Sequence, residues 1–320
     1  MARLSDVGED GFVEAVVGIL RGSWRCGSLG PGDDAACCGG GMEDVLLKVD
    51  GYSLASSRLP WMSMYDVGWK AAVAAMSDVN AKACRPVCVA LSLGLPSSTE
   101  LGEAVDVVRG ARDAALEHGA WLCGGDVNEA GEGWVDVAVV GRCGGVVLRI
   151  DSARPGDEVY VTTVNLGYTG AALQAFYGGW WSDAPGWLLE RAARPRLPAA
   201  FPRLASELGC VTSATDVSDG LAYSLWRLSE ASGTGILLEE VPRPRGLPGR
   251  VDVVEAVLYG GEEYDVVFTA RRGCGVVDAA RGLGLPVARI GRVVGGPPGV
   301  RWAGGGLVER RGWRHFSGRV

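Results

Sequence analysis

The sequence is poor in histidine and in lysine. His118 and His315 are its only histidines, and 28 of its 31 cationic side chains are arginine. A Ser-His-Asp triad or a histidine-rich zinc site would have to be built around one of these two histidines, so the sequence disfavours both kinds of site. We interpret the shortage of lysine, which leaves Lys48, Lys70 and Lys82, mainly as a coding bias.

Long apolar runs and an excess of positive charge are also missing. The chain carries 38 acidic and 31 basic side chains, a formal net charge of −7, and so lacks the basic surface of a nucleic-acid-binding protein. No stretch approaches the roughly 18 uncharged apolar residues of a membrane span, and the first residues lack the apolar core of a signal peptide. We therefore expect partners that are neither nucleic acids nor membranes.

Cysteine is present, but not in the pattern of a disulfide framework or a metal site. The nine cysteines are an odd number, are scattered along the chain and include no CxxC pair. Several of them lie in apolar stretches, which favours buried small side chains. From this usage we expect a cytoplasmic protein.

Apolar segments typical of strands alternate with segments typical of helices, which predicts an α/β (α+β) protein. The length of 320 residues suggests two domains of roughly 150 residues each. Because the apolar pattern breaks around residues 149–157, we divide the chain into an N-terminal domain, 1–150, and a C-terminal domain, 151–320. The predicted strands are residues 45–49, 87–95, 134–140, 158–162, 236–239, 264–269 and 287–294, and the predicted helices are residues 66–83, 100–118, 169–176, 199–208 and 219–232.

A glycine-rich turn at residues 30–36, Gly-Pro-Gly-Asp-Asp-Ala-Ala, carries two adjacent acids, Asp33 and Asp34. A phosphate-binding loop uses backbone N–H groups and usually a lysine, and the chain contains no GxxxxGK[ST] motif. Two carboxylates would repel a phosphate unless a divalent cation lay between them. A surface turn is the alternative interpretation of this segment alone.

Asp78 lies on the apolar face of a predicted helix. It follows Val67, Ala71 and Ala74 at helical spacing, which places its carboxylate on the buried side near the helix C-terminus. The helix dipole disfavours an anion there, and burial without a partner is costly. Asp78 therefore needs a metal ion or a cationic partner, unless it belongs to a buried ion pair or a cap that ends the helix.

Further acidic motifs stand at strand ends or beside glycines. They are Asp50 after an apolar strand, Asp126 after Gly124-Gly125, Asp216 and Asp219 in Asp-Val-Ser-Asp-Gly-Leu, and Gly-Gly-Glu-Glu-Tyr-Asp at residues 260–265. Each has a simpler interpretation as a turn cap, a solvated turn or, with Ser218 as N-cap, the start of a helix. Taken together, oxygen ligands without histidine predict Mg²⁺ that bridges carboxylates to phosphate oxygens.

In this order, the motifs resemble those of the thiamine-monophosphate kinase family in the aminoimidazole ribonucleotide synthetase-like superfamily. The resemblance rests on GDDAA (32–36), Asp50, Ser77-Asp78, GGD (124–126), ARPGD (153–157), DVSDGL (216–221), GGEEYD (260–265) and a terminal Gly-Trp-Arg-His-Phe at 312–316. It implies the two-domain fold of that superfamily and a homodimer whose interface is formed by the N-terminal sheets. It also implies phosphorylation of thiamine monophosphate by ATP to thiamine diphosphate, through direct in-line transfer assisted by several Mg²⁺ ions.

The resemblance implies a role for each matching residue. The residues implied in catalysis are Asp33, Asp78, Asp126 and Asp216. Those implied as Mg²⁺ ligands are Asp33, Asp34, Asp50, Asp78, Asp126, Asp216 and Asp219. Gly125, Asp126, Arg149 and Ser218 would bind the nucleotide, and Ser57, Glu263 and Trp313 would bind the thiamine substrate.

Two departures from the family pattern concern Lys48 and Ser57. Lys48 and Val49 precede Asp50 where the family usually has hydroxyl residues, and Ser57 stands where it usually has a histidine. Lys48 lies on the same strand face as Asp50, so it would replace one cation or touch a phosphate, unless it is an ordinary surface lysine.

Two other functions stay open at this point. One is another ATP-dependent reaction of the same superfamily with a different small-molecule substrate. The other is a non-catalytic protein that binds Mg²⁺ and a nucleotide.

Overall fold

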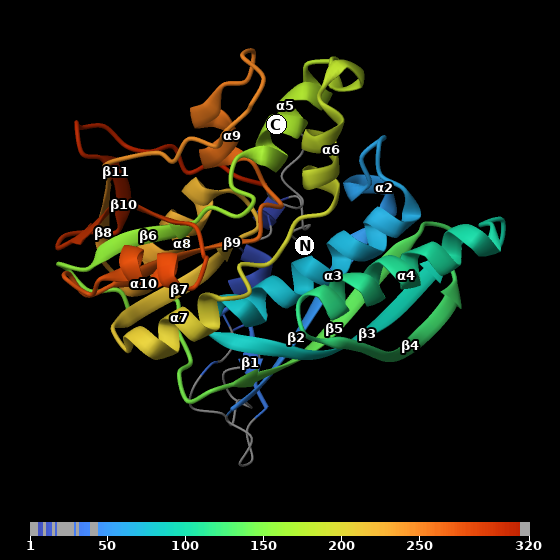
Figure 1. Cartoon of the computed structure of the whole chain (residues 1–320), viewed down its shortest axis with the longest axis horizontal. Helices are drawn as coiled ribbons and strands as arrows, with labels where there is room; N and C mark the ends of the chain where they lie inside the picture. The colour runs from blue at the N-terminus through green and yellow to red at the C-terminus, as the bar shows by residue number, and fades with distance from the viewer. Residues whose placement is uncertain are drawn as a thin grey trace.

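Two β-sheets lie side by side in the structure and are joined through a long helix (Figure 1). The structure is a computed structural model, which describes residues 6–8, 11–14, 17, 29, 32–38 and 44–313. Strands and helices alternate along both halves of the chain. The α/β (α+β) class expected from the sequence is therefore confirmed.

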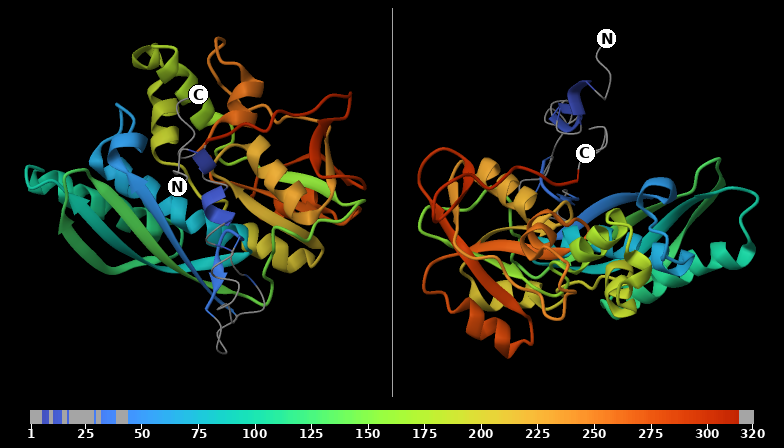
Figure 2. Two further views of the ribbon diagram at one scale, coloured as in Figure 1. Left: turned by 180° about the vertical axis from the view of Figure 1, so that it is seen from behind. Right: turned by 90° about the horizontal axis from the view of Figure 1, so that it is seen from above.

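The N-terminal sheet has five strands in the order β1-β2-β5-β3-β4. Strands β2, β5 and β3 pair antiparallel, and β4 pairs in parallel with β3. Helices α3 and α4 cover one face of this sheet (Figure 2). The bounds are β1 Ala36–Cys37, β2 Val45–Ser53, α2 Leu54–Ser57, α3 Met64–Ala81, β3 Cys84–Leu95, α4 Leu101–Glu117, β4 Trp121–Glu129 and β5 Trp134–Cys143.

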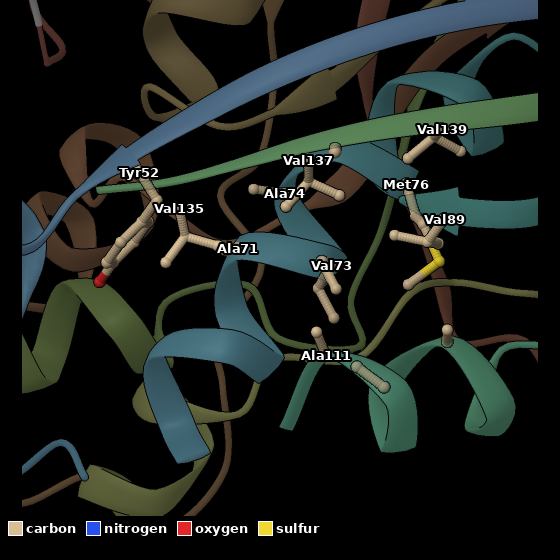
Figure 3. Close-up of a cluster of buried hydrophobic side chains, with 14 of the residues drawn as sticks. Tyr52, Ala71, Val73, Ala74, Met76, Val89, Ala111, Val135, Val137 and Val139 are labelled. Carbon is tan, nitrogen blue, oxygen red and sulfur yellow. The ribbon is translucent and has the colours of Figure 1, made fainter. Parts of the chain in front are cut away.

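The core of this half lies between the sheet and its two helices (Figure 3). On β5, Val135, Val137 and Val139 alternate with outward residues and are fully buried, as the two-residue period of a strand requires. They share one cluster with small residues of α3, among them Ala71 and Ala74. These small side chains let the helix lie close to the sheet.

The C-terminal sheet has six strands in the order β11-β8-β10-β6-β9-β7 and carries helices on both faces. Helices α8 and α9 pack in one cluster and α7 and α10 in the other. The bounds are β6 Glu158–Thr162, α5 Tyr168–Tyr177, η1 Trp181–Asp183, α6 Gly186–Ala193, α7 Phe201–Leu208, β7 Val211–Val217, α8 Leu221–Ser232, β8 Gly235–Leu238, α9 Val253–Tyr259, β9 Asp265–Ala270, α10 Val276–Gly282, β10 Val287–Val294 and β11 Gly299–Trp302.

Helix α3 is the element that both halves share. Every residue from Val67 to Ala81 is buried, because the N-terminal sheet and α4 cover one side and β7, β9, α6 and α7 contact the other. Its start is fixed by a capping box, in which the Asp66 N–H donates to Ser63 Oγ at 3.2 Å and the Ser63 N–H donates to the Asp66 carboxylate at 2.8 Å. Among the described residues, no helix has the length and apolar character needed to cross a membrane.

Some sequence-based expectations about local structure are wrong. Strand β4 does not end before its glycines but continues through them to Glu129, paired with β3. The helix predicted at residues 219–232 is present as α8, which begins at Leu221, while Asp216 lies near the end of strand β7, one residue before Val217. The N-cap of α8 is Gly220 and not Ser218; its φ of 104° is a conformation that glycine adopts readily. Strands β1, β7 and β11 and helices α2, α6, α9 and α10 were not predicted from the sequence.

The expectation that cysteines in apolar stretches are buried is wrong for Cys123, which is exposed, and Cys88 is only half-buried. Other cysteines form disulfides that the sequence did not predict. Cys84 and Cys143 form a disulfide between β3 and β5, and Cys210 and Cys274 form another. Cys37 is also disulfide-bonded. Spacing along the chain does not reveal such pairs, because it is the strand register that places Cys84 opposite Cys143.

Helices α3 and α4 touch at a pair of glycines. A Cβ atom added to Gly68 of α3 would overlap the backbone of Val107 in α4, and one added to Gly110 of α4 would overlap the backbone of Tyr65 in α3. Because the two contacts are reciprocal, the helix backbones lie against each other and leave no room for a side chain.

We predict that Gly110→Ala lowers the free energy of unfolding by about 1–3 kcal/mol, because the new methyl group forces the helices apart. Gly102→Ala, on the same helix, is the matched control, since its added Cβ meets nothing within 4 Å. That change should be neutral or stabilise by up to about 1 kcal/mol. Urea unfolding measures both, and equal stability of the two variants would contradict the close crossing.

Candidate active site

Three buried carboxylates meet between the two halves of the molecule. Asp34 comes from the turn before β1, Asp78 from the C-terminal end of α3, and Asp216 from the end of β7. Each offers one oxygen atom, and these three atoms lie within 4.8 Å of one another. The three residues are at most 7% exposed. The buried position predicted for Asp78 is thereby confirmed.

Hydroxyl groups hold Asp216 in place. Ser77 of α3 donates to Asp216 Oδ2 at 2.6 Å, and Ser218 donates to Oδ1 at 3.3 Å. Ser224 of α8 donates to the Asp216 carbonyl oxygen at 2.8 Å. The end of β7 is therefore tied both to α3 and to the start of α8.

Lys82, at the end of α3, is fully buried against the turn that carries Asp33 and Asp34, here called the double-aspartate turn. Its Nζ lies 2.6 Å from Asp33 Oδ1 and 2.8 Å from Asp34 Oδ2, and it donates to the Ala214 carbonyl oxygen at 2.8 Å. Arg227 Nη1 lies 3.3 Å from the other oxygen of Asp34. The protein itself thus neutralises the charge of this turn.

Lys48 on β2 pairs with Asp78, its Nζ 2.7 Å from Asp78 Oδ2. The Lys48 side chain is 23% exposed and that of Asp78 10% exposed. Of the two interpretations that the sequence left open, the surface lysine is therefore excluded. Lys48 acts as a cation inside the acidic cluster.

The carboxylates differ in how fully their charge is compensated. Burial raises the pKa of Asp78 well above its usual range; Lys48 opposes this shift and the Asp216 charge adds to it. Burial and the Asp34 charge likewise raise the pKa of Asp216 to about 6. Burial would also raise the pKa of Asp34, but Lys82 and Arg227 outweigh it and lower that pKa to about 2. A further cation would therefore stabilise the ionised forms of Asp78 and Asp216 most.

The charge balance shows what this cluster can hold. Five carboxylates converge here with three cationic side chains, so the cluster has a formal excess of about two negative charges when every carboxylate is ionised, as a bound cation would favour. The carboxylates are those of Asp33, Asp34, Asp50, Asp78 and Asp216, and the cations are Lys48, Lys82 and Arg227. Oxygen ligands, no histidine and this residual charge fit a divalent cation such as Mg²⁺.

Arg149, Ser218, Asp219 and Trp313 lie around the same cluster. The Ile150 N–H donates to Asp33 Oδ2 at 3.2 Å, so Arg149 lies next to the double-aspartate turn. Its guanidinium pairs with Asp151 at 2.6 Å. The Trp313 N–H donates to the Asp219 carbonyl oxygen at 3.2 Å, which brings the half-exposed indole to the start of α8.

Gly125 and Asp126 are not brought to this cluster within one chain. Both lie on β4, an edge strand whose residues are all exposed except Leu122. Gly125 pairs with Leu91, which pairs with Val137, which in turn pairs with Asp50. Three gaps between strands, at about 4.8 Å each, therefore separate β4 from β2 by about 14 Å.

The turn at residues 260–265 packs against the end of β7 in a strained backbone. Glu262 and Tyr264 have φ values of 59° and 54°, in the left-handed region that costs a non-glycine residue energy. The Tyr264 N–H donates to the Val217 carbonyl oxygen at 2.8 Å, and the Glu262 N–H donates to that of Ser218. Strain of this kind is often concentrated at functional sites.

Glu263, between these two residues, is fully buried. The Gly170 N–H at the start of α5 donates to its Oε1 at 3.0 Å, whereas Oε2 has no hydrogen-bond partner among the described residues. Burial raises the pKa of Glu263 well above its usual range. Ser57, the third predicted substrate residue, lies on α2, and its carbonyl oxygen accepts a hydrogen bond from the Tyr52 hydroxyl at 2.6 Å.

One pair at this site was missed in the sequence. Lys70, fully buried on α3, has its Nζ 2.6 Å from Glu262 Oε2. With this pair, all three lysines of the chain hold acids at the boundary between the two halves. The scarcity of lysine was the signal that would have identified these positions.

Known proteins share this architecture. Residues 32–143 match the N-terminal domain of AIR synthase related proteins, and residues 154–303 match their C-terminal domain. The thiamine-monophosphate kinase of Pyrobaculum calidifontis is 37% identical over 308 residues, which cover 94% of this chain and 95% of that protein. The thiamine-monophosphate kinase of Halobacterium salinarum is 34% identical over 294 residues, which cover 89% and 94%.

Solved structures agree with these matches. The crystal structure of tt0281 from Thermus thermophilus has a TM-score of 0.87 and 33% identity, covering 96% of this chain and 100% of that one. AaThiL complexed with AMPPCP and TMP has a TM-score of 0.84 and 25% identity, covering 98% and 99%. The two-domain fold implied by the sequence motifs is thereby confirmed.

We predict that Lys82→Met lowers the free energy of unfolding by about 3–5 kcal/mol at pH 7, because Asp33 and Asp34 would stay buried without their partner. The pKa of Asp34 is about 2 in the wild-type fold, below the unfolded value of 3.8. Its contribution is thus complete above pH 3.8 and is lost as the pH falls toward 2. The difference between variant and wild type should therefore shrink in acid.

The matched control is Arg203→Met, which breaks an exposed ion pair with Glu207. Such a pair contributes less than about 1 kcal/mol, so this variant should stay near wild type at both pH values. Chemical unfolding at about pH 7 and about pH 3 measures both variants. An equal loss for Lys82→Met at the two pH values would contradict a pairing role for Lys82.

Proposed function

Because the chain belongs to the AIR synthase related family and, within it, to the thiamine-monophosphate kinases, we propose that it uses ATP to phosphorylate thiamine monophosphate to thiamine diphosphate. The transfer is direct and in line, with several Mg²⁺ ions assisting. The observation that carries this proposal is the buried, oxygen-only cluster of Asp34, Asp78 and Asp216, in a chain whose curated relatives are named for this activity.

The residues of the cluster divide the work between them. Bound to Asp78, Asp216 and the neighbouring aspartates, Mg²⁺ would neutralise charge on phosphate oxygens. Lys82 keeps Asp34 ionised and holds both Asp33 and Asp34 in place. The attacking oxygen belongs to a phosphate that is already ionised, so the site needs no strong general base.

The histidine content agrees with a reaction that needs no such base. His118 Nε2 accepts the Leu197 N–H at 3.0 Å, and its Nδ1 lies 2.7 Å from the Ala114 carbonyl oxygen. Both ring nitrogens are therefore engaged in holding the backbone, and His118 lies outside the cluster. His315, with the rest of the terminal Arg-His-Phe, lies outside the described residues.

We place the nucleotide and the substrate on either side of the aspartates. Arg149, Ser218, Gly125 and Asp126 remain the predicted nucleotide contacts, and the position of Ser218 beside Asp216 supports this. On the substrate side, Trp313 offers a half-exposed indole for stacking on the cationic thiazolium. Glu263 remains a predicted substrate residue whose buried Oε2 has no partner among the described residues, and Ser57 lies at the end of α2.

A homodimer would complete the site. The N-terminal sheet exposes apolar side chains on its outer face, among them Leu47, Val49, Trp121 and Val127, from 46% to 71% exposed. Strand β1 pairs only with Leu46 and Leu47 of β2. Within the described part of the chain, the rest of β2 after Lys48 therefore has a free edge, and β4 has one as well. If two copies pair these edges, Asp126 of the second copy lies beside Asp50 of the first. Asp126 would then be a metal ligand in the site of the other copy, as the sequence predicts.

The division of labour follows from the same arrangement. We assign nucleotide and Mg²⁺ binding and dimerisation to residues 1–150, and completion of the nucleotide and substrate site to residues 151–320. We place the enzyme in the cytoplasm, where ATP is made. Its disulfides remove the support that cysteine usage gave to this placement, which therefore rests on the proposed activity.

We predict that Asp78→Asn and Asp216→Asn each lower the rate of thiamine diphosphate formation about 100-fold or more, because each removes a carboxylate that organises charge in the transition state. The assay follows thiamine diphosphate and ADP after incubation with Mg²⁺, ATP and thiamine monophosphate. Asp106→Asn, on the exposed surface of α4, is the control and should leave the rate unchanged.

The outcomes separate the three candidate functions. Wild-type protein that binds ATP but forms no thiamine diphosphate has another substrate or none. ADP release with another small molecule would then identify a different reaction of the superfamily, and nucleotide binding without any ADP release would identify a non-catalytic protein.

We also predict that two inactive variants complement each other. If Asp126 acts in the site of the second copy, mixing Asp78→Asn with Asp126→Asn and allowing subunits to exchange forms heterodimers with one intact site. A random mixture should recover about a quarter of wild-type activity. A mixture no more active than either variant alone would mean that Asp126 does not act across the interface.

A further inference from the structure

Lys48 differs from the other two lysines of this chain in what its ammonium group has left to bind. Lys82 is fully buried, and its three N–H bonds have three acceptors in Asp33, Asp34 and the Ala214 carbonyl oxygen. Lys70 is fully buried against Glu262. Lys48 is partly exposed and has Asp78 as its one partner among the described residues.

The charges that act on the Lys48 ammonium are those of three carboxylates. Asp78 Oδ2 is at 2.7 Å, and the carboxylates of Asp50 and Asp216 also act on it. Asp50 lies two residues further along β2, on the same face of the strand. The ammonium therefore stands among the oxygens that would otherwise hold a divalent ion.

An ammonium group and a metal ion exclude each other from such a position. Lysine has three donors and no acceptor, so it cannot be a metal ligand while it is charged. An ion bound to the same oxygen of Asp78 would lie against the positive charge of Lys48 and be repelled.

We propose that Lys48 is a built-in cation of the active site: its ammonium takes the place of one divalent ion at Asp78, and its remaining N–H groups bind an oxygen of the phosphate being transferred. This inference rests on the proposed kinase function and refines it. Because Lys48 is fixed to β2, its charge is present at any concentration of free Mg²⁺. The protein then needs fewer metal ions than its aspartates alone would gather.

The number of bound metal ions tests this directly. Purified full-length protein is dialysed against Mn²⁺ with AMPPCP, and bound Mn²⁺ is counted per chain. Lys48→Met and Lys48→Gln, which lose the charge, should each bind about one more Mn²⁺ than wild type. Lys48→Arg, which keeps the charge, and Arg109→Gln, which removes an exposed charge far from the site, should bind the same number as wild type.

Two further measurements extend the test, one on wild type and one on Lys48→Met. Without nucleotide, wild type should bind about one Mn²⁺ ion per chain, since about two negative charges remain uncompensated in the cluster. Lys48→Met should also need a several-fold higher concentration of Mg²⁺ for half-maximal activity.

The inference is overturned if Lys48→Met and Lys48→Gln bind no additional Mn²⁺, or if wild type without nucleotide binds two or more ions at the cluster. These outcomes are separable from the fate of the proposed function. An unchanged metal count with normal thiamine diphosphate formation removes the role of Lys48 alone, whereas an added ion in the variants with no thiamine diphosphate formed by wild type removes the substrate assignment alone.

Discussion

The buried charges of helix α3 depend on partners that lie elsewhere in the molecule. Asp66 pairs with Arg194, and Lys70 pairs with Glu262. An unpartnered charge in the interior costs several kcal/mol, roughly as much as a domain can lose. Helix α3 can therefore be buried only if the C-terminal half docks against it, and the charges fix how it docks.

The acidic cluster is a product of this docking. Ser77 and Asp78 meet Asp216 only because the end of β7 lies against the end of α3. Lys82, one helical turn after Asp78, holds the double-aspartate turn at this site through an ion pair with Asp33. It also donates to the backbone of β7 at Ala214. The contacts that join the two halves are thus the same contacts that bring the acidic side chains together.

Much of this could be predicted from local pattern. The helical spacing before Asp78 predicted its buried side, and acids beside glycines marked the other positions, because turns and strand ends are encoded by neighbouring residues. The partners of Lys48 and Lys70 could not be predicted, since each pair joins residues that are far apart along the chain. The course of β4 through Gly124 and the pairing of Cys84 with Cys143 depend on strand register, which local spacing does not contain.

The scarcity of lysine has a physical explanation in this site. A coding bias toward arginine would replace lysine wherever either residue serves, which holds at most of the exposed surface. Arginine is a wide, planar group with five donors, whereas the ammonium of lysine is a compact point charge. At Lys82, three acceptors surround one nitrogen within 2.8 Å, and at Lys48 one nitrogen stands among carboxylates. A guanidinium, whose donors are spread over three nitrogens, fits the position of Lys82 less well, so lysine remains there.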